Sequence, residues 1–452
     1  MKKIAVIGAG LSGLLSAYIL SRGTDVSITV FEKGQAYADR LSDKASDMLS
    51  GVGGAGTLSG GKLCFPPASF GVWNKTGFIV DDFMNFVKTC LNPLLNANIV
   101  ESESISYSSE KSKTGIFNKG FQTRLLLADE MRLFVSGLLS ALVEQNVQIK
   151  TNTEFINFEK TNNTISVFYK GGESGLCADA FDYVIVASGR SSAKNIVDWF
   201  AEDNVTQVSP DLGIRVSIGD EENEVFANHG RDIKLKTTYG NVGVRTFCVC
   251  SGGDNALVQY ENRLYYDGHF GGGLSETVNF GILARNKDIV GVKNGIDYCV
   301  ELAHLVDKDI SLKDVIRHSS KFLTSQSRFG CVFEAIRRFV LQMRDDGLIS
   351  ANLDKYQVFM PSIDRLNPVI STNKFFETAD ENIYVVGDAA GISRGFVQSM
   401  WSAYYASEHI LWKIMAEEMP ERRLNDDHKR HPDFWRGRIS SRLFYQRIWQ
   451  ET

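Results

Sequence analysis

The sequence predicts an α/β fold, and three short segments carry this prediction. Residues 3–7, 183–188 and 383–386 are mostly apolar runs, and each is followed directly by a glycine. Such runs are typical of parallel strands that are buried on both faces. Helical patterns follow the first and the last run, as expected where helices cover a sheet. We therefore expect a Rossmann-like parallel sheet with a β-meander, together with an inserted α+β domain.

Composition narrows the class of protein. The chain has 452 residues, with 43% hydrophobic and 23% charged residues, which is an ordinary globular balance. A total of 40 Gly against 8 Pro excludes a collagen-like chain, and a net charge of −5 argues against a nucleic-acid footprint over the whole surface. Seven Cys without a CxxC pair and seven scattered His favour reduced thiols in a cytoplasmic protein without a metal site. The sequence contains no uninterrupted run of 18 apolar residues, so it predicts no transmembrane helix.

A glycine-rich turn follows the first predicted strand. Gly8-Ala9-Gly10-Leu11-Ser12-Gly13 separates the run at 3–7 from a helical pattern over 14–21, and a second strand at 26–31 ends in Glu32. In such a turn Gly8 permits the tight bend, Gly10 lets the backbone approach a pyrophosphate, and Gly13 lets helix and strand pack closely. The helix N-terminus offers N–H groups to phosphates, and Glu32 is expected to accept both hydrogen bonds of an adenosine ribose diol. The segment therefore predicts dinucleotide binding.

Two distant segments favour FAD over NAD. The second apolar run ends at Gly189, and the third ends in Gly387-Asp388 before a helical pattern from about Phe396. A carboxylate such as Asp388 suits the hydroxyls of a ribityl chain, and a helix N-terminus suits the flavin edge that becomes negative on reduction. No second strand-GxGxxG-helix pattern exists, so a dedicated NAD(P)H domain is not expected. Either the substrate is the reductant, or NAD(P)H binds as a transient donor, or another protein delivers the electrons.

A second glycine-rich segment covers residues 51–63, with six glycines in thirteen residues. Its backbone N–H groups are expected to form an anion-binding concavity beside the pyrophosphate or the flavin. Lys62 is expected near the flavin N1 or N5 edge, where its charge would stabilise the reduced anion.

With these segments the chain resembles FAD-dependent oxidoreductases of the glutathione-reductase-type superfamily, and more narrowly a bacterial group of FAD-dependent dehydrogenases of unknown substrate. The narrower resemblance rests on residues 51–63, 129–132, 189–192 with 210–215, and 245–253. It implies non-covalent FAD and a contact of the backbone near Phe155 with adenine. The residues expected to bind FAD are Gly8, Gly10, Leu11, Ser12, Gly13, Glu32, Lys33, Gly54, Gly56, Thr57, Ser59, Lys62, Phe155, Gly189, Gly387, Asp388, Gly395, Phe396 and Val397.

The remaining pattern predicts three regions. Residues 1–204 and 366–415 are expected to form a discontinuous FAD-binding domain, with a helix over 125–145 and a β-meander over 153–170. Residues 205–365 alternate strands and glycine-rich turns with helical stretches at 296–306 and 330–345, which predicts a substrate domain. Residues 416–452 form a C-terminal tail, in which 434–449 carry four Arg, no acid and five aromatics.

Candidate catalytic residues are Lys62, Arg245 and His269. Arg245, like Arg190 and Arg215, suits a clamp on a carboxylate or phosphate or a structural ion pair. His269 and Tyr239 are candidate acid/base groups. Cys248 and Cys250 alternate on a predicted strand, which suits either disulfide exchange beside a flavin or two small buried residues.

Three functions remain open from the sequence. The first is an FAD-dependent oxidoreductase that moves a hydride between flavin N5 and a small organic substrate. The second is an FAD monooxygenase that uses NAD(P)H and O2, with the aromatic segment 65–73 in its favour. The third is an electron-transfer or scaffold flavoprotein that meets a protein partner through residues 434–452. The glycines at 268–273 remain unassigned.

Overall fold

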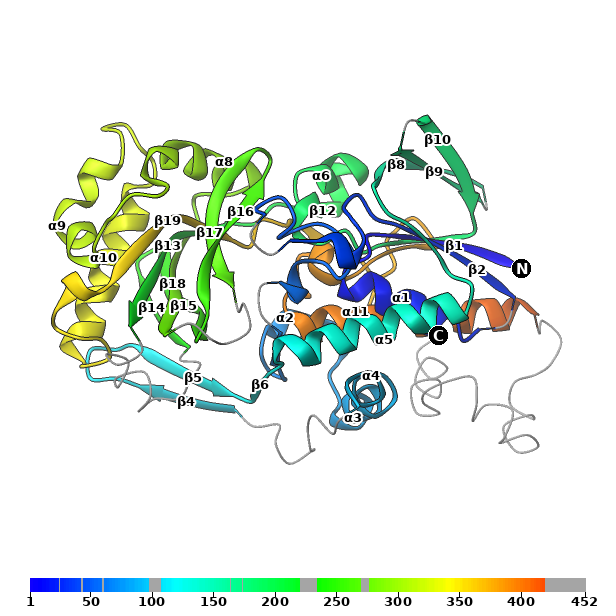
Figure 1. Cartoon of the computed structure of the whole chain (residues 1–452), viewed down its shortest axis with the longest axis horizontal. Helices are drawn as coiled ribbons and strands as arrows, with labels where there is room; N and C mark the ends of the chain where they lie inside the picture. Colours follow the sequence, from blue (N-terminus) through cyan, green and yellow to red (C-terminus); the bar gives the residue numbers. More distant parts are fainter. Residues whose placement is uncertain are drawn as a thin grey trace.

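The computed structural model describes residues 1–418, apart from residues 24, 42–43, 59–60, 97–106, 163, 173, 220–233 and 270–275. A parallel sheet with its helices and an antiparallel sheet with its own helices lie side by side (Figure 1). Within the described residues, no helix combines the length and apolar character that a membrane crossing requires.

The three apolar runs belong to one five-stranded parallel sheet. Its order is β21-β11-β1-β2-β7, and every neighbouring pair is parallel. Every residue of the strand at 183–186 and of the strand at 383–385 is buried, which explains why these runs do not alternate in polarity. The strands are β1 (Lys2–Ile7), β2 (Val26–Phe31), β7 (Gln148–Lys150), β11 (Tyr183–Val186) and β21 (Ile383–Val385).

Helices and a β-meander lie on opposite sides of this sheet (Figure 1). The helices are α1 (Leu11–Leu20), α5 (Ala128–Glu144) and α11 (Phe396–Glu418). The antiparallel meander is β8 (Thr153–Thr161), β9 (Thr164–Gly171) and β10 (Ser174–Phe181). The side chain of Trp401 on α11 packs against the rings of Trp73, Phe83 and Phe86. Trp73, from the aromatic segment 65–73, therefore belongs to the core.

The second sheet is antiparallel and has seven strands. In spatial order they are β19 (Gln357–Asp364), β13 (Asp211–Gly219), β18 (Thr277–Asn286), β15 (Val242–Ser251), β14 (Leu235–Tyr239), β5 (Phe117–Phe121) and β4 (Tyr107–Lys111). The hairpin β16 (Asp254–Tyr260) and β17 (Arg263–His269) lies beside it. Three longer helices accompany the sheet: α8 (Val292–Glu301), α9 (Leu312–Phe322) and α10 (Gly330–Asp345).

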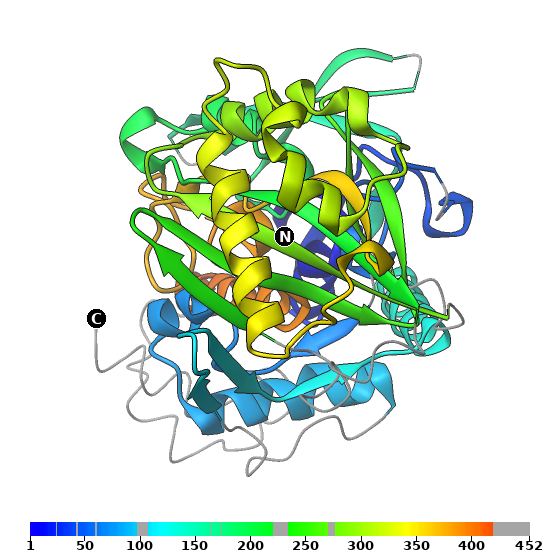
Figure 2. The same cartoon turned by 90° about the vertical axis from the view of Figure 1, so that its left-hand side faces the viewer.

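Helix α10 crosses the face of the second sheet (Figure 2). Its buried residues recur at helical spacing, among them Val332, Ile336, Phe339 and Met343, because a helix on a sheet buries one stripe. These residues share a hydrophobic core with the apolar residues of β13 and β18, and this core is separate from the core of the parallel sheet.

Shorter elements complete the described chain. They are the pairs β3 (Lys62–Cys64) with β6 (Thr123–Leu125) and β12 (Val205–Thr206) with β20 (Val369–Ile370), and the helices α2 (Phe70–Thr76), α3 (Val80–Phe86), α4 (Asn92–Leu95) and α6 (Asn195–Trp199).

The predicted fold class is confirmed: a Rossmann-like parallel sheet with a meander is combined with a second, mixed region. One boundary differs from the prediction. Residues 107–111 and 117–121, which the sequence assigns to the FAD-binding domain, form β4 and β5 and extend the second sheet through the pairing of β5 with β14. The division of the chain into three domains otherwise stays a prediction.

A buried ion-pair network joins the two sheets. The carboxylate of Asp364 at the end of β19 is fully buried, and it pairs with Arg394, with Arg245 at 3.1 Å and with Arg190 at 3.8 Å. Burial alone would raise the pKa of Asp364, but the guanidiniums of Arg394, Arg190 and Arg245 outweigh burial and hold it well below its ordinary value. Since Arg190 and Arg394 follow strands of the parallel sheet, Asp364 ties that sheet to the second one.

We expect Asp364→Asn to lower the free energy of unfolding by about 3 kcal/mol at pH 7, because it leaves buried guanidiniums without a full charge partner. The folded pKa of Asp364 is depressed, so its stabilisation is present above the unfolded value of about 3.9 and is lost as the pH falls below it. The difference in the free energy of unfolding between the variant and the wild type should therefore become smaller at acidic pH. Urea unfolding at several pH values measures it.

The matched control is Asp179→Asn. Asp179 pairs with Lys150 at 3.2 Å, but its side chain is 47% exposed, so we expect a change below about 1 kcal/mol. Equal effects of the two variants would contradict the role assigned to Asp364.

Candidate functional site

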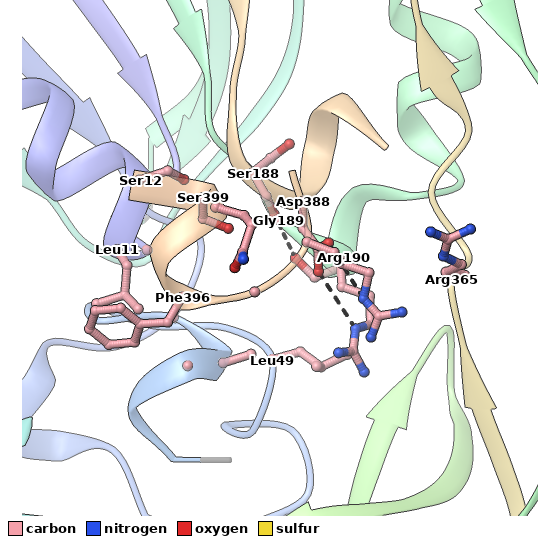
Figure 3. Close-up of a pocket in the computed structure, with 18 of the residues that line it drawn as sticks. Leu11, Ser12, Leu49, Ser188, Gly189, Arg190, Arg365, Asp388, Phe396 and Ser399 are labelled. Carbon is pink, nitrogen blue, oxygen red and sulfur yellow. Dashed lines mark hydrogen bonds and ion pairs between the residues drawn. The ribbon is translucent and has the colours of Figure 1, made fainter. Parts of the chain in front are cut away.

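A cleft of about 700 Å³ runs along the carboxyl ends of the parallel strands and reaches the second sheet. The residues that follow β1, β2, β11 and β21 all line it, which is the usual place for a ligand in an open parallel sheet. Its volume lies within the range of small-molecule sites. Figure 3 shows part of its wall, where the start of α1 faces the segment that leads into α11.

The turn after β1 uses its glycines in two ways. Gly8 has φ +100°, and a Cβ there would lie 2.6 Å from the carbonyl oxygen of Ala187; a Cβ on Gly13 would lie 1.9 Å from the carbonyl oxygen of Gly8. Both positions are therefore closed to other residues by the packing of the protein itself. A Cβ on Gly10 would instead meet nothing closer than Gly54 Cα at 3.8 Å. The backbone at Gly10 is thus open to the cleft, as close approach of a pyrophosphate requires.

Glu32 is tied to the backbone more fully than the sequence predicts. Its carboxylate is 5% exposed and accepts hydrogen bonds from the N–H groups of Ala9 at 2.8 Å, Gly34 at 2.8 Å and Gly51 at 2.9 Å. A carboxylate offers about four acceptor positions, so one is left where the predicted contact with both ribose hydroxyls needs two. Glu32 therefore fixes the turn against the second glycine-rich segment.

Arg40 holds that second segment in place. Its guanidinium donates to the carbonyl oxygens of Val52 at 2.8 Å and Gly54 at 3.0 Å and to Oγ1 of Thr57 at 3.0 Å. Burial lowers the pKa of Arg40, and Glu32 and Asp47 oppose that effect. Sequence reasoning missed Arg40, because an arginine outside any motif carries no signal of the loop that it binds.

The end of β21 supplies the other wall. Gly387 has φ +67°, and its N–H donates to Oγ of Ser402 at 2.8 Å, which fixes the start of the segment. Asp388 lines the cleft and lies 3.9 Å from Nε of Arg190 (Figure 3). Gly395, with φ +109°, and Phe396 also line the cleft, directly at the start of α11.

The opposite end of the cleft is aromatic. Phe155 lies edge-on to the ring of Trp199 with centroids 4.8 Å apart, and both line the cleft together with Thr153 and Asn195. This end suits a flat heterocycle. Trp199 was not singled out from the sequence, since it lies in a short helix without a motif.

Most of the residues predicted to bind FAD line this one cleft. Those that do are Gly8, Gly10, Leu11, Ser12, Glu32, Lys33, Gly54, Gly56, Lys62, Phe155, Gly189, Asp388, Gly395 and Phe396. Four described residues do not: Gly13 and Gly387 serve the packing of the turns, Thr57 bonds to Arg40, and Val397 is fully buried in the core. Ser59 lies outside the described residues.

Of the three candidate catalytic residues, Lys62 and Arg245 line the cleft and His269 does not. Lys62 lines the cleft, and its ammonium donates to the carbonyl oxygen of Val249 at 2.6 Å. Arg245 also lines it, but its guanidinium pairs with Asp211 at 2.6 Å and with Asp364 at 3.1 Å.

Two predicted acid/base groups lie away from the cleft wall. His269 ends β17 and is not among the lining residues, and burial lowers its pKa. Tyr239 bonds to Gln342 and stacks with Arg338, and burial raises its pKa to about 12. Among the described residues, no group of three His, Cys, Asp or Glu side chains is arranged to hold a metal ion.

Comparison with known proteins supports the fold. Residues 6–44 match the model of an NAD(P)-binding Rossmann-like domain. No curated protein matches the chain. The match of residues 6–44 and the parallel sheet thus agree in describing a Rossmann-like fold.

Several solved structures are similar to this chain. They include CtdE in complex with FAD (13% identity, 100% of this chain and 98% of that chain, TM-score 0.40). A flavoprotein/dehydrogenase from Cytophaga hutchinsonii has 11% identity over 95% of this chain and 82% of that chain, with TM-score 0.43. The p-nitrophenol 4-monooxygenase PnpA from Pseudomonas putida DLL-E4 has 14% identity over 94% and 83%, with TM-score 0.39. At this level of similarity, the reactions of these proteins say nothing of the reaction of this chain.

A pair of glycine variants tests the turn. Gly13→Ala should lower the free energy of unfolding by about 1–3 kcal/mol, because its Cβ overlaps a backbone oxygen. Gly10→Ala should leave the stability of the ligand-free protein unchanged but weaken dinucleotide binding by roughly tenfold or more, about 1.4 kcal/mol. Thermal unfolding without ligand and titration with FAD separate the two effects. Unaltered FAD affinity in Gly10→Ala would refute the placement of the pyrophosphate.

Proposed function

We propose that the protein is an FAD-dependent oxidoreductase that moves a hydride between flavin N5 and a small organic substrate. The observation that carries this proposal is one continuous cleft lined by the glycine turn, by Asp388 and by the second sheet. A nucleotide alone would not need Asp388 and the start of α11, which lie more than 350 residues after the turn in sequence. The resemblance to the glutathione-reductase-type superfamily, and to bacterial FAD-dependent dehydrogenases, agrees with this assignment.

The chain's own residues suit the parts of FAD. The aromatic end at Phe155 and Trp199 would take the adenine, the open backbone at Gly10 the pyrophosphate, and Asp388 the ribityl hydroxyls. When bound, FAD supplies a two-electron acceptor at N5. Lys62 lies on the adjoining wall, where a lysine ammonium would favour a negatively charged flavin. Sequestration between the two sheets would keep bulk water from the reacting atoms.

The wall contributed by the second sheet is rich in positive charge. Lys119, Lys234, Lys236, Arg245, Arg285 and Arg365 line the cleft there. Arg245 and Arg285 share the carboxylate of Asp211, and Arg245 also pairs with Asp364. Basic side chains therefore predominate on the described part of this wall, and this positive charge suits a substrate with at least one carboxylate or phosphate group.

Arg365 is the residue on which that substrate class depends. No described residue gives its guanidinium a hydrogen bond or an ion pair, and the side chain is exposed in the cleft (Figure 3). Partial desolvation and the nearby charges of Arg285 and Arg394 lower its pKa to about 10. Its backbone has φ +54°, a strained value for arginine that concentrates at functional sites.

The proposal is tested first by the cofactor. Purified protein should contain FAD, or take it up after removal, and the flavin should bleach when mixed without oxygen with NADH, NADPH or a suitable metabolite. A panel of carboxylates, phosphate esters and neutral alcohols distinguishes substrate from donor. Colourless protein that takes up no FAD would end the proposal.

A monooxygenase that uses NAD(P)H and O2 is the second candidate. The absence of a second nucleotide-binding motif in the sequence favours it. The aromatic segment 65–73 supports it less than the sequence suggests, since Phe65 and Trp73 are buried in the core and only Pro67 to Phe70 line the cleft. Oxygen consumption coupled to NAD(P)H, with a hydroxylated product, would decide for this candidate.

The scaffold candidate rests on residues 434–452, which lie outside the described residues. Its test is deletion of that segment: loss of partner binding with unchanged flavin reduction would favour it.

We expect Arg365→Gln to weaken the apparent affinity of any anionic compound that bleaches the flavin by roughly tenfold or more, since a charged hydrogen bond contributes about 1.5–3 kcal/mol. The control is Arg337→Gln, an exposed arginine of α10 that pairs only with Glu334 among the described residues. Anaerobic titrations of both variants provide the measurement. A compound without negative charge that reduces the flavin equally well in the wild type and in Arg365→Gln would contradict the assigned substrate class.

A further inference from the structure

Two cysteines of β15 lie against each other on the cleft wall. The Sγ atoms of Cys248 and Cys250 are 3.7 Å apart. In a regular strand, alternate residues are separated by about 6.6 Å along the chain and their side chains run side by side. Here the pairing of β15 with β18 shifts register between Phe247 and Cys250, and Cys248 has φ +40°. A β-bulge thus turns the two side chains toward one another.

The two thiols differ in exposure. Cys248 is half-buried and lines the cleft, whereas Cys250 is 5% exposed and lies behind it. The left-handed backbone at Cys248 is costly for a residue with a side chain, by roughly 1 kcal/mol or more, and such strain concentrates at functional sites. Two small core residues would not require this conformation.

Two cations are fixed around the pair. The ammonium of Lys62 donates to the carbonyl oxygen of Val249, the residue between the cysteines, at 2.6 Å. The guanidinium of Arg215 has no exposed surface and donates to the carbonyl oxygen of Cys248 at 3.1 Å. The hydrogen bond from Cys250, together with Lys62 and Arg215, lowers the pKa of Cys248 to about 6, and the same hydrogen bond raises the pKa of Cys250. These contacts favour a thiolate at Cys248 and a thiol at Cys250, and a thiolate is the form that reacts.

We propose that Cys248 and Cys250 are a redox-active dithiol that exchanges two electrons with the FAD of the proposed function, on which this inference rests. The thiolate of Cys248 faces the cleft and so meets the flavin first. A sulfur–sulfur bond forms between the two residues, the S–H bond of Cys250 breaks, and two electrons with that proton pass to oxidised flavin. Thiolate, thiol and FAD thus become disulfide and FADH⁻, which balances charge, hydrogen and electrons without another reactant. The reverse step reduces the disulfide.

The pair therefore gives the holoenzyme a second store for two electrons beside the flavin. Such a store suits an enzyme without a dedicated NAD(P)H domain, because it can hold reducing equivalents after a transient donor has left.

Reductive titration of the holoenzyme tests the proposal without a known substrate. After mild oxidation, the wild type should take up twice as many reducing equivalents of dithionite per FAD as Cys250→Ser or Cys248→Ser. In Cys250→Ser the thiolate of Cys248 remains beside oxidised flavin, so a long-wavelength charge-transfer absorbance should appear; Cys248→Ser should lack it. Cys331→Ser, which alters a cysteine of α10 outside the cleft lining, should titrate like the wild type.

Peptide mapping gives a readout that does not depend on FAD. Treatment of the folded protein with diamide should yield a disulfide between Cys248 and Cys250, and dithiothreitol should remove it. Equal titration of the wild type and both serine variants, with no such disulfide on mapping, would overturn the proposal. Circular dichroism of each variant excludes misfolding, with Cys250→Ala as a second substitution. Protein that forms the disulfide but binds no FAD would refute the proposed function, and with it the exchange of electrons with a flavin, while the two cysteines would still form an oxidisable pair.

Discussion

The buried carboxylate of Asp364 is the interaction on which the arrangement of the two sheets depends. It ends β19 in the second sheet and pairs with Arg394 and Arg190, which follow strands of the parallel sheet. The two hydrophobic cores do not merge, so polar contacts join the sheets across the cleft; Asp364 is a fully buried one, and the ion pair of Arg190 with Asp267 at 3.0 Å adds to it. Asp364 also orients the next residue. The chain is anchored at Asp364, and Arg365, which has a left-handed backbone, places its side chain on the cleft wall.

The positive wall of the cleft contrasts with the charge of the whole chain. The protein carries a net charge of −5, yet the described cleft wall of the second sheet gathers lysines and arginines from four strands and two loops. Charge of one sign in a cleft with low-dielectric walls focuses the field there and raises the local concentration of oppositely charged molecules. The negative remainder of the surface would direct anions away from other faces, so association should weaken as ionic strength rises.

The sequence predicts local features far better than distant ones. The strand, turn and helix at the N-terminus could be predicted, because glycine spacing and apolar runs report the backbone geometry within about thirty residues. The joining of β5 to β14 could not, since it brings together residues more than one hundred positions apart without a local signal. The same reason hides Arg40 and Arg365, whose roles come from the loops that surround them. Residue type alone also does not reveal whether a side chain reaches the cleft: His269, a candidate from the sequence, is not among the lining residues.

The order of strands in the parallel sheet determines when each strand can pair during synthesis of the chain. β1 lies between β2, which is made directly afterwards, and β11, which is made only once residues 183–186 emerge; β21 joins last, from residues 383–385. At translation rates of about 5–20 residues per second, an apolar strand edge therefore waits for many seconds without its partner. During this time the unpaired edge of β1 can pair with other chains. The yield of folded protein in the cell should therefore depend on chaperones that shield strand edges.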